Sequence, residues 1–234
     1  MAFRKAFDLY ANVRPVKTLV PGGRYEDIDL VLIRENTEGL YVGVEHIMGM
    51  VGYPHAAAES VMIITRFGAE RVCRYAFEYA RANGRKKVTL AHKANILKFT
   101  QGLFLEAGRK VAEDFPDIEW EDRIIDATAM HLVLDPYRFD VLVMENMFGD
   151  ILSDQGGGIL GSLGLMPSAC VGPEKSYYEP SHGSAPDIAG QGIANPYSMI
   201  GSVAMMLEMS FGMDKEARNL WQAMQAVFVA GFTT

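Results

Sequence analysis

A short apolar run followed by two acidic residues four positions apart is the feature that most constrains the fold. The run from Phe139 to Met144 is mostly apolar, which is typical of a buried strand. Gly149 then permits a sharp turn, and Asp150 stands where a helix would begin, so Asp150 and Asp154 share one face of that predicted helix. Two carboxylates this close repel unless a cation lies between them, and Mg²⁺ or Mn²⁺ prefers such oxygen ligands. The alternative is a pair of solvated acids that the helix dipole favours in a first turn.

The same order of strand, polar residue and helix recurs along the chain and predicts an α/β fold. Apolar runs at 28–33, 61–65, 88–91 and 118–125 are typical of strands. Amphipathic segments at 66–83, 100–115, 128–134, 197–209 and 214–228 predict helices, with Thr100 and Asp214 as caps of two of them. In α/β sheets, ligands gather beyond the carboxyl ends of the strands. The polar residues expected to converge there are Arg34, Lys93, Asp126 and Asp150.

Glycine and proline mark the segments around these elements. The sequence PGG at 21–23 predicts a turn, and the glycine-rich stretch 43–54 predicts a projecting loop or hairpin, an arm onto a partner subunit. Three glycines at 156–158 continue the predicted helix. Each costs about 1 kcal/mol relative to alanine, so a neighbouring segment is expected to need the space. The stretch 179–190 is rich in turn formers and predicts a long polar loop that can wrap a ligand.

Composition narrows the class of protein. The chain has 234 residues, 49% of them apolar, which suffices for one large or two small domains. A net charge of −7 argues against a nucleic-acid-binding surface. With only two cysteines, a disulfide framework or a Cys₄ zinc site is not expected, and a reducing compartment fits. No apolar run reaches the roughly 18 residues of a membrane span. We expect a soluble, cytoplasmic protein that binds neither nucleic acid nor membrane.

Single residues have candidate roles that the pattern leaves open. Arg4, Arg14 and Arg34 could each hold a carboxylate through two N–H groups, or form surface ion pairs. Tyr41 fits proton donation and a structural hairpin almost equally well. Lys93 could be a general base if burial lowers its pKa, although a lysine after a strand is normally a solvated turn residue. The chain has neither G-x-G-x-x-G nor the P-loop pattern, so no standard phosphate-binding loop is expected.

Six motifs, in order along the chain, resemble those of the β-decarboxylating dehydrogenases for isocitrate, homoisocitrate, 3-isopropylmalate and tartrate. They are DLYANVRP at 8–15, RENTEGLY at 34–41, HKANI at 92–96, GDILSD at 149–154, HGSAPDIAG at 182–190 and ANP at 194–196. The resemblance implies the two-domain isopropylmalate/isocitrate dehydrogenase-like α/β fold, with central sheets flanked by helices and a non-Rossmann cofactor site. Residues 1–10 and 162–234 would form part of the large, cofactor-side domain. Residues 11–161 would form a small domain with the substrate and metal site, the arm and the dimer interface.

The resemblance also implies a role for each matching residue. Tyr41 would protonate the enolate after CO₂ leaves, and Lys93, reaching in from the partner subunit, would remove the hydroxyl proton. A divalent ion would be held by Asp150 and Asp154 together with an Asp126 that also comes from the partner subunit. The implied residues are Arg4, Arg14, Arg34 and Asn95 for the substrate, Asp126, Asp150 and Asp154 for Mg²⁺ or Mn²⁺, and His182, Gly183, Ser184, Ala185, Asp187, Ile188 and Asn195 for the cofactor.

Asp187 and Ile188 bear on the choice of cofactor. A carboxylate accepts a hydrogen bond from a ribose 2′-OH but repels a 2′-phosphate. Members of the resembling family that use NADP carry Lys-Tyr at the matching positions. NAD is therefore the expected cofactor, in a homodimer or higher oligomer with shared active sites.

The resemblance also bears on length and substrate. Family chains carry further segments before Arg4 and after Thr234, so this chain resembles a fragment or truncated homologue without the N-terminal part of the large domain. The motifs at 38–41 and 92–96 resemble isocitrate or homoisocitrate enzymes, whereas DATAMH at 126–131 resembles isopropylmalate enzymes. Isocitrate is the expected substrate. Isopropylmalate, homoisocitrate and a non-catalytic regulatory subunit are the alternatives.

Overall fold

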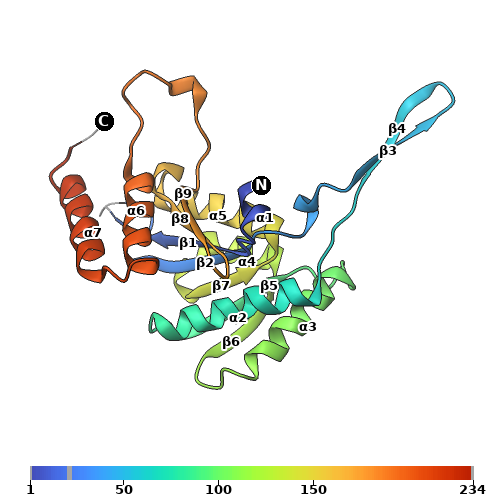
Figure 1. Ribbon diagram of the computed structural model, residues 1–234, viewed down its shortest axis with the longest axis horizontal. Coiled ribbons are helices and arrows are strands. Elements are labelled where there is room, and N and C mark those ends of the chain that lie inside the picture. The colour runs from blue at the N-terminus through green and yellow to red at the C-terminus, as the bar shows by residue number, and fades with distance from the viewer. Residues whose placement is uncertain (1, 20–22, 233–234) are drawn as a thin grey trace.

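The computed structural model describes residues 2–19 and 23–232, which contain a seven-stranded mixed sheet with helices on both faces (Figure 1). The strand order is β6-β5-β7-β2-β1-β8-β9. Strands β6, β5, β7 and β2 run parallel, and β1, β8 and β9 continue the sheet antiparallel. The α/β fold predicted from the sequence is confirmed. The strands are β1 (Ala11–Lys17), β2 (Asp29–Glu35), β3 (Glu45–Met50), β4 (Tyr53–Ser60), β5 (Lys87–His92), β6 (Glu119–Ile124), β7 (Val141–Met144), β8 (Pro167–Val171) and β9 (Ser176–Pro180), and the helices are α1 (Ala2–Ala6), α2 (Arg66–Ala82), α3 (Thr100–Ala112), α4 (Ile125–Leu134), α5 (Asn146–Leu160), α6 (Tyr197–Met209) and α7 (Asp214–Val229).

Alternating side chains of the central strands build a core on each face of the sheet. In β2, Val31 and Ile33 belong to the cluster formed with α2 and α3, whereas Leu30 and Leu32 belong to the cluster formed with α5. Burial on both faces explains why these strands are almost continuously apolar in sequence. The carboxyl ends of β2, β5, β6 and β7 therefore share one sheet edge that is fixed between helical layers.

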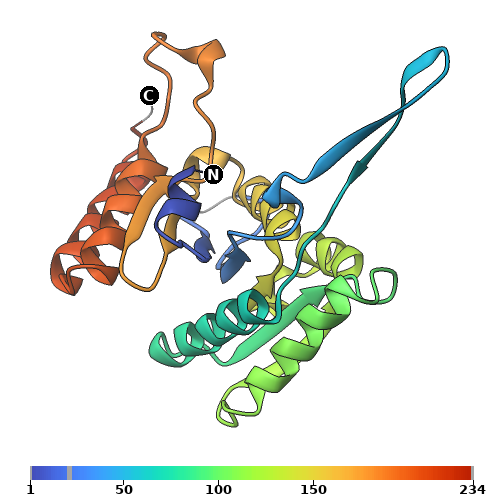
Figure 2. The ribbon, with the colours of Figure 1, turned by 45° about the vertical axis from the view of Figure 1, so that its right-hand side comes forward.

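Strands β3 and β4 form a separate hairpin that projects far from the body of the molecule (Figures 1 and 2). Every residue of both strands is exposed, including the apolar side chains of Ile47, Met50 and Tyr53. A lone two-stranded hairpin is marginally stable in water. The projecting hairpin predicted at 43–54 is confirmed and extends further, to Ser60.

The strand predicted at 61–65 is wrong. Pairing of β4 ends at Ser60, and beyond it only Ile63 forms an isolated bridge, to Gly39. On the opposite leg the backbone turns at Gly39 and Gly43, with φ of 74° and 76°, values that favour glycine. The β-branched residues at 61–65 therefore lie extended without a strand to pair with.

Three predicted helix starts also differ from the structure. Thr100 and Asp214 are the first residues of α3 and α7, and neither is the N-cap residue. Helix α4 follows β6 directly, so Asp126 lies in its first turn and not at a strand end. Residues 21–22 of the predicted turn lie outside the described residues. The predicted domain boundary lies at 161–162. Strand β8 lies beyond this boundary and pairs with β1, so one sheet contains strands from both predicted domains. The division into two domains stays a prediction.

The glycines at 156–158 continue α5, as expected, and two of them make room for neighbours. A Cβ atom on Gly156 would lie 2.8 Å from Val16 Cγ2, and one on Gly157 would lie 2.6 Å from Leu163 Cδ2. The expectation of close packing is confirmed for these two. A Cβ atom on Gly158 would have nothing within 4 Å, because this position faces outward.

Candidate active site

Helix α5 begins at Asn146 and not near Asp150, as the sequence had predicted. Buried Glu145 is its N-cap, and the carboxylate accepts hydrogen bonds from the backbone N of Met147 (3.1 Å) and Phe148 (3.0 Å). Burial holds the pKa of Glu145 above its usual range, although these two bonds oppose the shift. The cap fixes where α5 starts, and Asp150 consequently lies in the second turn.

Gly149 serves close packing and not the turn that the sequence had suggested, since it lies within α5. A Cβ atom at this position would lie 2.5 Å from Cγ and 2.6 Å from Cβ of Arg34. The absence of a side chain lets the helix approach β2 at the point where Arg34 leaves the strand. Arg34 can then run beside the helix to Asp150.

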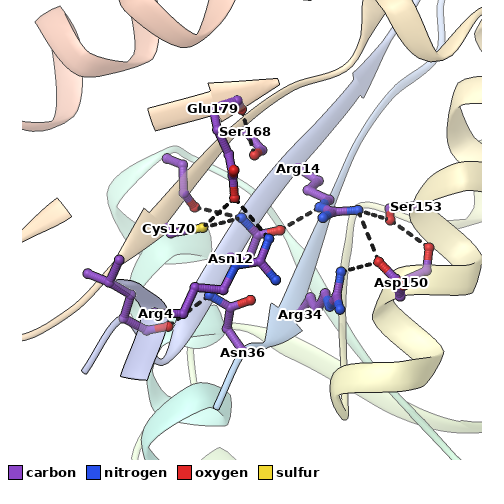
Figure 3. A network of polar contacts seen from close by, with 12 residues as sticks. Arg4, Asn12, Arg14, Arg34, Asn36, Asp150, Ser153, Ser168, Cys170 and Glu179 are labelled. Carbon is purple, nitrogen blue, oxygen red and sulfur yellow. Dashed lines mark hydrogen bonds and ion pairs between the residues drawn. The ribbon is translucent and has the colours of Figure 1, made fainter. Parts of the chain in front are cut away.

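Two arginines lie beside Asp150, as Figure 3 shows, and the hydroxyl of Tyr41 donates to the same carboxylate. Buried Arg34 donates to the Asp150 carboxylate and, at 2.8 and 3.0 Å, to Oδ1 of Asn146. Nη1 of buried Arg14 lies 3.9 Å from Asp150 Oδ1. The Tyr41 hydroxyl donates to Asp150 Oδ2 at 2.5 Å. We call Arg14, Arg34, Tyr41 and Asp150 the Asp150 cluster.

Burial and crowding shift the pKa values of this cluster. Burial, with Arg34 and Arg4 nearby, lowers the pKa of Arg14 to about 10, against the opposing effect of Asp150. Burial would raise the pKa of Asp150, but the Tyr41 hydroxyl and both arginines together hold it below its usual range. Burial and the hydrogen bond to Asp150 raise the pKa of Tyr41, so its hydroxyl keeps its proton at neutral pH. The Arg14 guanidinium is thus a buried cation that lies beside other cations. A bound anion would stabilise its charged form.

Arg4, the third predicted carboxylate-binding residue, is engaged with an acid of its own. Its Nη2 forms an ion pair with Glu179 Oε1 at 2.8 Å, which joins α1 to β9. Asp150 and Arg4 influence each other electrostatically, as do Arg4 and Arg14. The three predicted arginines therefore lie near one another, as Figure 3 shows.

Asp154 lies one turn beyond Asp150 on the same helix and is exposed. Its carboxyl group is nevertheless partly buried, and this burial and the nearby Asp150 raise its pKa, while Arg14 and Arg34 oppose the shift. Within residues 2–19 and 23–232, no three His, Cys, Asp or Glu side chains lie together in a way that could hold a metal. Mg²⁺ is commonly held by one or two carboxylates with water and substrate, and the Asp150–Asp154 pair fits that donor set.

Lys93 and Asp126 form a second group along the same edge. Lys93 follows β5, Asp126 follows β6, and Lys93 Nζ lies 2.6 Å from Asp126 Oδ1. Strand β7 separates β5 from β2, which carries Arg34. The single chain therefore brings Lys93 to Asp126 without assembling Asp126, Asp150 and Asp154 into one site.

The predicted cofactor residues, 182–195, lie in a long, largely exposed loop between β9 and α6 (Figure 1). The loop predicted at 179–190 begins two residues later than expected, because Glu179 and Pro180 pair with β8 at the end of β9. It extends away from the sheet and contains one short 3-10 turn, Pro186–Ile188. Oδ1 of Asn195 accepts from the backbone N of Tyr197 at 2.9 Å, where α6 begins. Asn95 is likewise exposed, in the turn after β5. The assignment of these residues to cofactor and substrate stays a prediction.

Sequence reasoning missed several partners of the predicted residues. Asn12 could have been found, because it lies two positions before Arg14 and therefore on the same strand face. Glu145 and Asn146 directly follow the strand that ends at Met144, which was also a usable signal. The partners of Arg4 and of Arg14 across the fold had no sequence signal. The missed residues are Asn12, Glu145, Asn146, Ser153 and Glu179.

Two general expectations can also be compared with the structure. Cys73 and Cys170 are both buried and unpaired, so the expected absence of a disulfide framework agrees with these two residues. None of the helices among the described residues combines the length and apolar character needed to cross a bilayer.

Known proteins resemble this chain over almost its whole length. The family described as isocitrate/isopropylmalate dehydrogenase matches residues 1–234. The chain is 48% identical to 3-isopropylmalate dehydrogenase of Archaeoglobus fulgidus, a match that covers 99% of this chain and 69% of the relative. It is 50% identical to the mitochondrial NAD isocitrate dehydrogenase catalytic subunit 5 of Arabidopsis thaliana, over 88% of this chain and 54% of that protein.

A solved structure agrees with the sequence matches. The crystal structure of isocitrate dehydrogenase from Methylococcus capsulatus has a TM-score of 0.95 and 52% identity, and the match covers 98% of this chain and 68% of that one. The chain thus spans between 54% and 69% of the length of these three proteins. The predicted isopropylmalate/isocitrate dehydrogenase-like fold is confirmed. This chain belongs to the isocitrate/isopropylmalate dehydrogenase family, which is a family of β-decarboxylating dehydrogenases.

Proposed function

We propose that this protein catalyses the NAD-dependent oxidative decarboxylation of a 2-hydroxy acid that carries a β-carboxylate, with isocitrate as substrate and Mg²⁺ or Mn²⁺ as the metal. The observation that carries the proposal is the convergence of Arg14, Arg34 and Tyr41 on Asp150. Guanidinium groups recognise carboxylates through paired N–H bonds. With Arg4 nearby, a substrate with three carboxylates offers each arginine an anionic partner.

Substrate binding would change the partners of Asp150. Substrate carboxylates would take the N–H group of Arg34 that now donates to Asp150 and the N–H groups of Arg14 that now donate to Asn12 and Ser153. Asp150 and Asp154, with Asp126 of the partner subunit, would then be available to hold Mg²⁺ or Mn²⁺. An ion held there supplies Lewis acidity, which draws electrons from the substrate oxygen as the β-carboxylate departs.

The proton transfers fall to two side chains. Lys93, reaching in from the partner subunit, would take the hydroxyl proton as the hydride leaves C2 for the nicotinamide ring of NAD. Tyr41, whose raised pKa keeps its hydroxyl protonated, would deliver a proton to the carbon that loses CO₂. Both roles match the chemistry of the groups: a flexible amine as base and a phenol hydrogen-bonded inside the site as acid.

The separation of the two groups supports a shared site. Lys93 and Asp126 pair with each other, away from the Asp150 cluster of the same chain. In a homodimer or higher oligomer, the Lys93–Asp126 pair of one chain would complete the cluster of another. The exposed apolar hairpin β3–β4 supports the same assembly, because a partner would cover it.

NAD is the proposed cofactor, and the loop after β9 its proposed contact. The Asp187 carboxylate suits a free ribose 2′-OH, and the Arabidopsis relative is named as an NAD enzyme. The proposed contacts are His182, Gly183, Ser184, Ala185, Asp187, Ile188 and Asn195. With two buried, unpaired cysteines, we also propose a reducing location, the cytoplasm.

3-Isopropylmalate and homoisocitrate are the alternative substrates. The Archaeoglobus relative, named for isopropylmalate, is almost as similar to this chain as the solved isocitrate dehydrogenase. A non-catalytic regulatory subunit is the alternative from another class. It gives no reason for the full set of Tyr41, Lys93, Asp126, Asp150 and Asp154, and the Arabidopsis relative is named a catalytic subunit.

The test is steady-state NADH formation with isocitrate, homoisocitrate, 3-isopropylmalate and tartrate, each with Mn²⁺ and with a chelator. We expect the highest kcat/KM with isocitrate and loss of activity on metal removal. Asp150→Asn should raise the Mn²⁺ concentration required for half-maximal rate. If a dimeric, folded protein forms no NADH with any of the four substrates, the proposal is contradicted and the regulatory subunit is favoured. A higher kcat/KM with another acid would reassign the substrate.

A further inference from the structure

His92, the last residue of β5, is buried and lies directly before Lys93. Its Nδ1 accepts a hydrogen bond from the backbone N of Ala94 at 3.1 Å. Because a backbone N–H only donates, Nδ1 must carry its lone pair there and not a proton. The ring of His92 therefore presents an acceptor to the turn that carries Lys93.

The other ring nitrogen is fixed from the opposite side. Nε2 of His92 lies 3.1 Å from Asp122 Oδ1, and Oδ2 of Asp122 accepts from Arg109 Nη2 at 3.0 Å. Burial would raise the pKa of Asp122, but the bonds from Arg109 and His92 hold it below its usual range, so it is an ionised acceptor. Nε2 must then be the protonated nitrogen. Arg109, Asp122 and His92 form a chain of hydrogen bonds that ends at the Ala94 amide.

Lys93 is held on its other side as well. Its backbone N donates to Oε1 of fully buried Gln101 at 3.3 Å. Its carbonyl accepts from the backbone N of Ile96 at 3.1 Å and of Leu97 at 2.9 Å. The turn after β5 is thus built on two buried side chains, His92 and Gln101, that leave the Lys93 side chain pointing outward to Asp126.

Such support matters because a lysine side chain cannot fix its own direction. It has a flexible four-carbon stem with many rotamers, and an ion pair with exposed Asp126 is of the kind that contributes little to stability. Misplacement of a reacting group by about 1 Å can cost a factor of about 10² in rate. The backbone of Lys93 is therefore where its direction can be set.

We propose that His92, kept as its Nε2–H tautomer by Asp122 and Arg109, is a positioning residue that holds the turn of Lys93 in place for proton abstraction. The kinetic part of this inference rests on the proposed role of Lys93 as the base. The structural part, the tautomer and the hold on Ala94, does not.

The structural part is tested by NMR on the full chain. The ¹⁵N chemical shifts of the His92 ring should show an unprotonated Nδ1 and a protonated Nε2. The Ala94 amide should exchange with solvent faster in His92→Leu than in wild type, and His92→Asn, whose side-chain oxygen can replace Nδ1, should restore much of the protection. Amides of α6 serve as the internal reference for global unfolding.

Thr89→Val is the matched control. Thr89 is a buried residue of the same strand, and its hydroxyl makes a comparable bond to β6, donating to Glu121 Oε1 at 3.1 Å. It should leave Ala94 exchange and kcat unchanged. A protonated Nδ1, or an Ala94 amide equally protected in His92→Leu, would overturn the proposal.

The kinetic part compares kcat with KM. We expect His92→Leu to lower kcat about tenfold or more, with KM for isocitrate within about threefold, because the arginines are untouched. His92→Asn should recover part of kcat. If His92→Leu keeps the wild-type kcat while Lys93→Ala lowers kcat, the positioning role is refuted. If Lys93→Ala also keeps the wild-type kcat, the proposed function is refuted, and the tautomer and exchange results then decide the structural role.

Discussion

At the residue scale, the site is defined by competition for Asp150. Tyr41 and Arg34 donate hydrogen bonds to this one carboxylate, and the Arg14 guanidinium lies 3.9 Å from it. In the proposed function, the arginines bind substrate carboxylates and Tyr41 donates a proton to a substrate carbon. The Asp150 carboxylate lies beside the two buried arginines, which explains how both guanidinium groups can stay charged.

Tyr41→Phe should lower kcat by about 10² or more, the usual contribution of a positioned general acid. KM for isocitrate should change little, because Arg14 and Arg34 remain. Tyr137→Phe is the control: its hydroxyl also donates a hydrogen bond, to the carbonyl of Glu26 at 2.8 Å, but Tyr137 precedes β7 and so lies at the amino end of that strand. Steady-state kinetics of both variants decide the matter, and an unchanged kcat in Tyr41→Phe would remove Tyr41 as the acid.

Gly149→Ala should raise KM for the substrate about tenfold or more. An added Cβ would lie 2.5 Å from Arg34 Cγ, and a displaced guanidinium loses charged hydrogen bonds of roughly 1.5–3 kcal/mol each. Gly158→Ala in the same helix is the control, since nothing lies within 4 Å of the new methyl group. That variant should raise the unfolding free energy by up to about 1 kcal/mol and keep KM. Equal KM values for both variants would contradict the packing account.

The sequence predicted the charged members of this site better than their supports. Arg14, Arg34 and Asp150 stand in recognisable motifs, and Arg34 lies at a strand end, where ligands are expected. Glu145 was missed because Gly149-Asp150 has the composition of a turn and a cap, and only the packing of α5 against β2 shows that Gly149 is there for Arg34. Ser153 and Glu179 meet their arginines from positions 139 and 175 residues away.

At the scale of elements, apolar periodicity predicted the helices well. Helix α6 has the predicted bounds, 197–209, because its apolar face is long and its ends are marked by proline and glycine. The run at 61–65 failed for a physical reason: β propensity forms no strand without a neighbour, and the facing leg turns away at Gly39. Local patterns thus fix which segments are apolar, while strand pairing depends on the rest of the chain.

The pair of strands β5 and β6 carries the Lys93 turn, and its stability should depend on pH through Glu121. The hydrogen bond from Arg123, opposed by burial and aided by Lys87, lowers the pKa of Glu121 to about 2 from a usual 4.5. A group whose pKa is lower in the folded state stabilises the fold above its unfolded pKa, and this stabilisation disappears as pH falls through the folded pKa.

Glu121→Gln should therefore reduce the unfolding free energy by about 1 kcal/mol at pH 7, a value that allows for solvent screening. The difference from wild type should shrink between about pH 4.5 and pH 2. Denaturant unfolding across this range measures it, with Glu119→Gln at an exposed position of the same strand as control. A difference independent of pH would show that Glu121 acts by packing and not by charge.

At the scale of the whole molecule, the chain carries two groups of polar side chains that the proposed function brings together from two subunits. Arg14, Arg34, Tyr41 and Asp150 form one, and Lys93 with Asp126 forms the other. The hairpin β3–β4, exposed along both strands, projects from the fold (Figure 2) and directly follows the 3-10 turn Leu40–Val42, which contains Tyr41. The proposed catalytic unit of two chains would account for these features.

Mixing two inactive variants tests this claim most directly. Lys93→Ala chains and Asp150→Asn chains are refolded together and assayed for NADH formation with isocitrate, at a Mn²⁺ concentration too low for either variant to be active alone. If sites are shared, each mixed dimer has one site with both substitutions and one with neither, and the mixture should recover about a quarter of wild-type activity. If each site lies within one chain, every site keeps a defect, and a mixture no more active than its components would contradict the account.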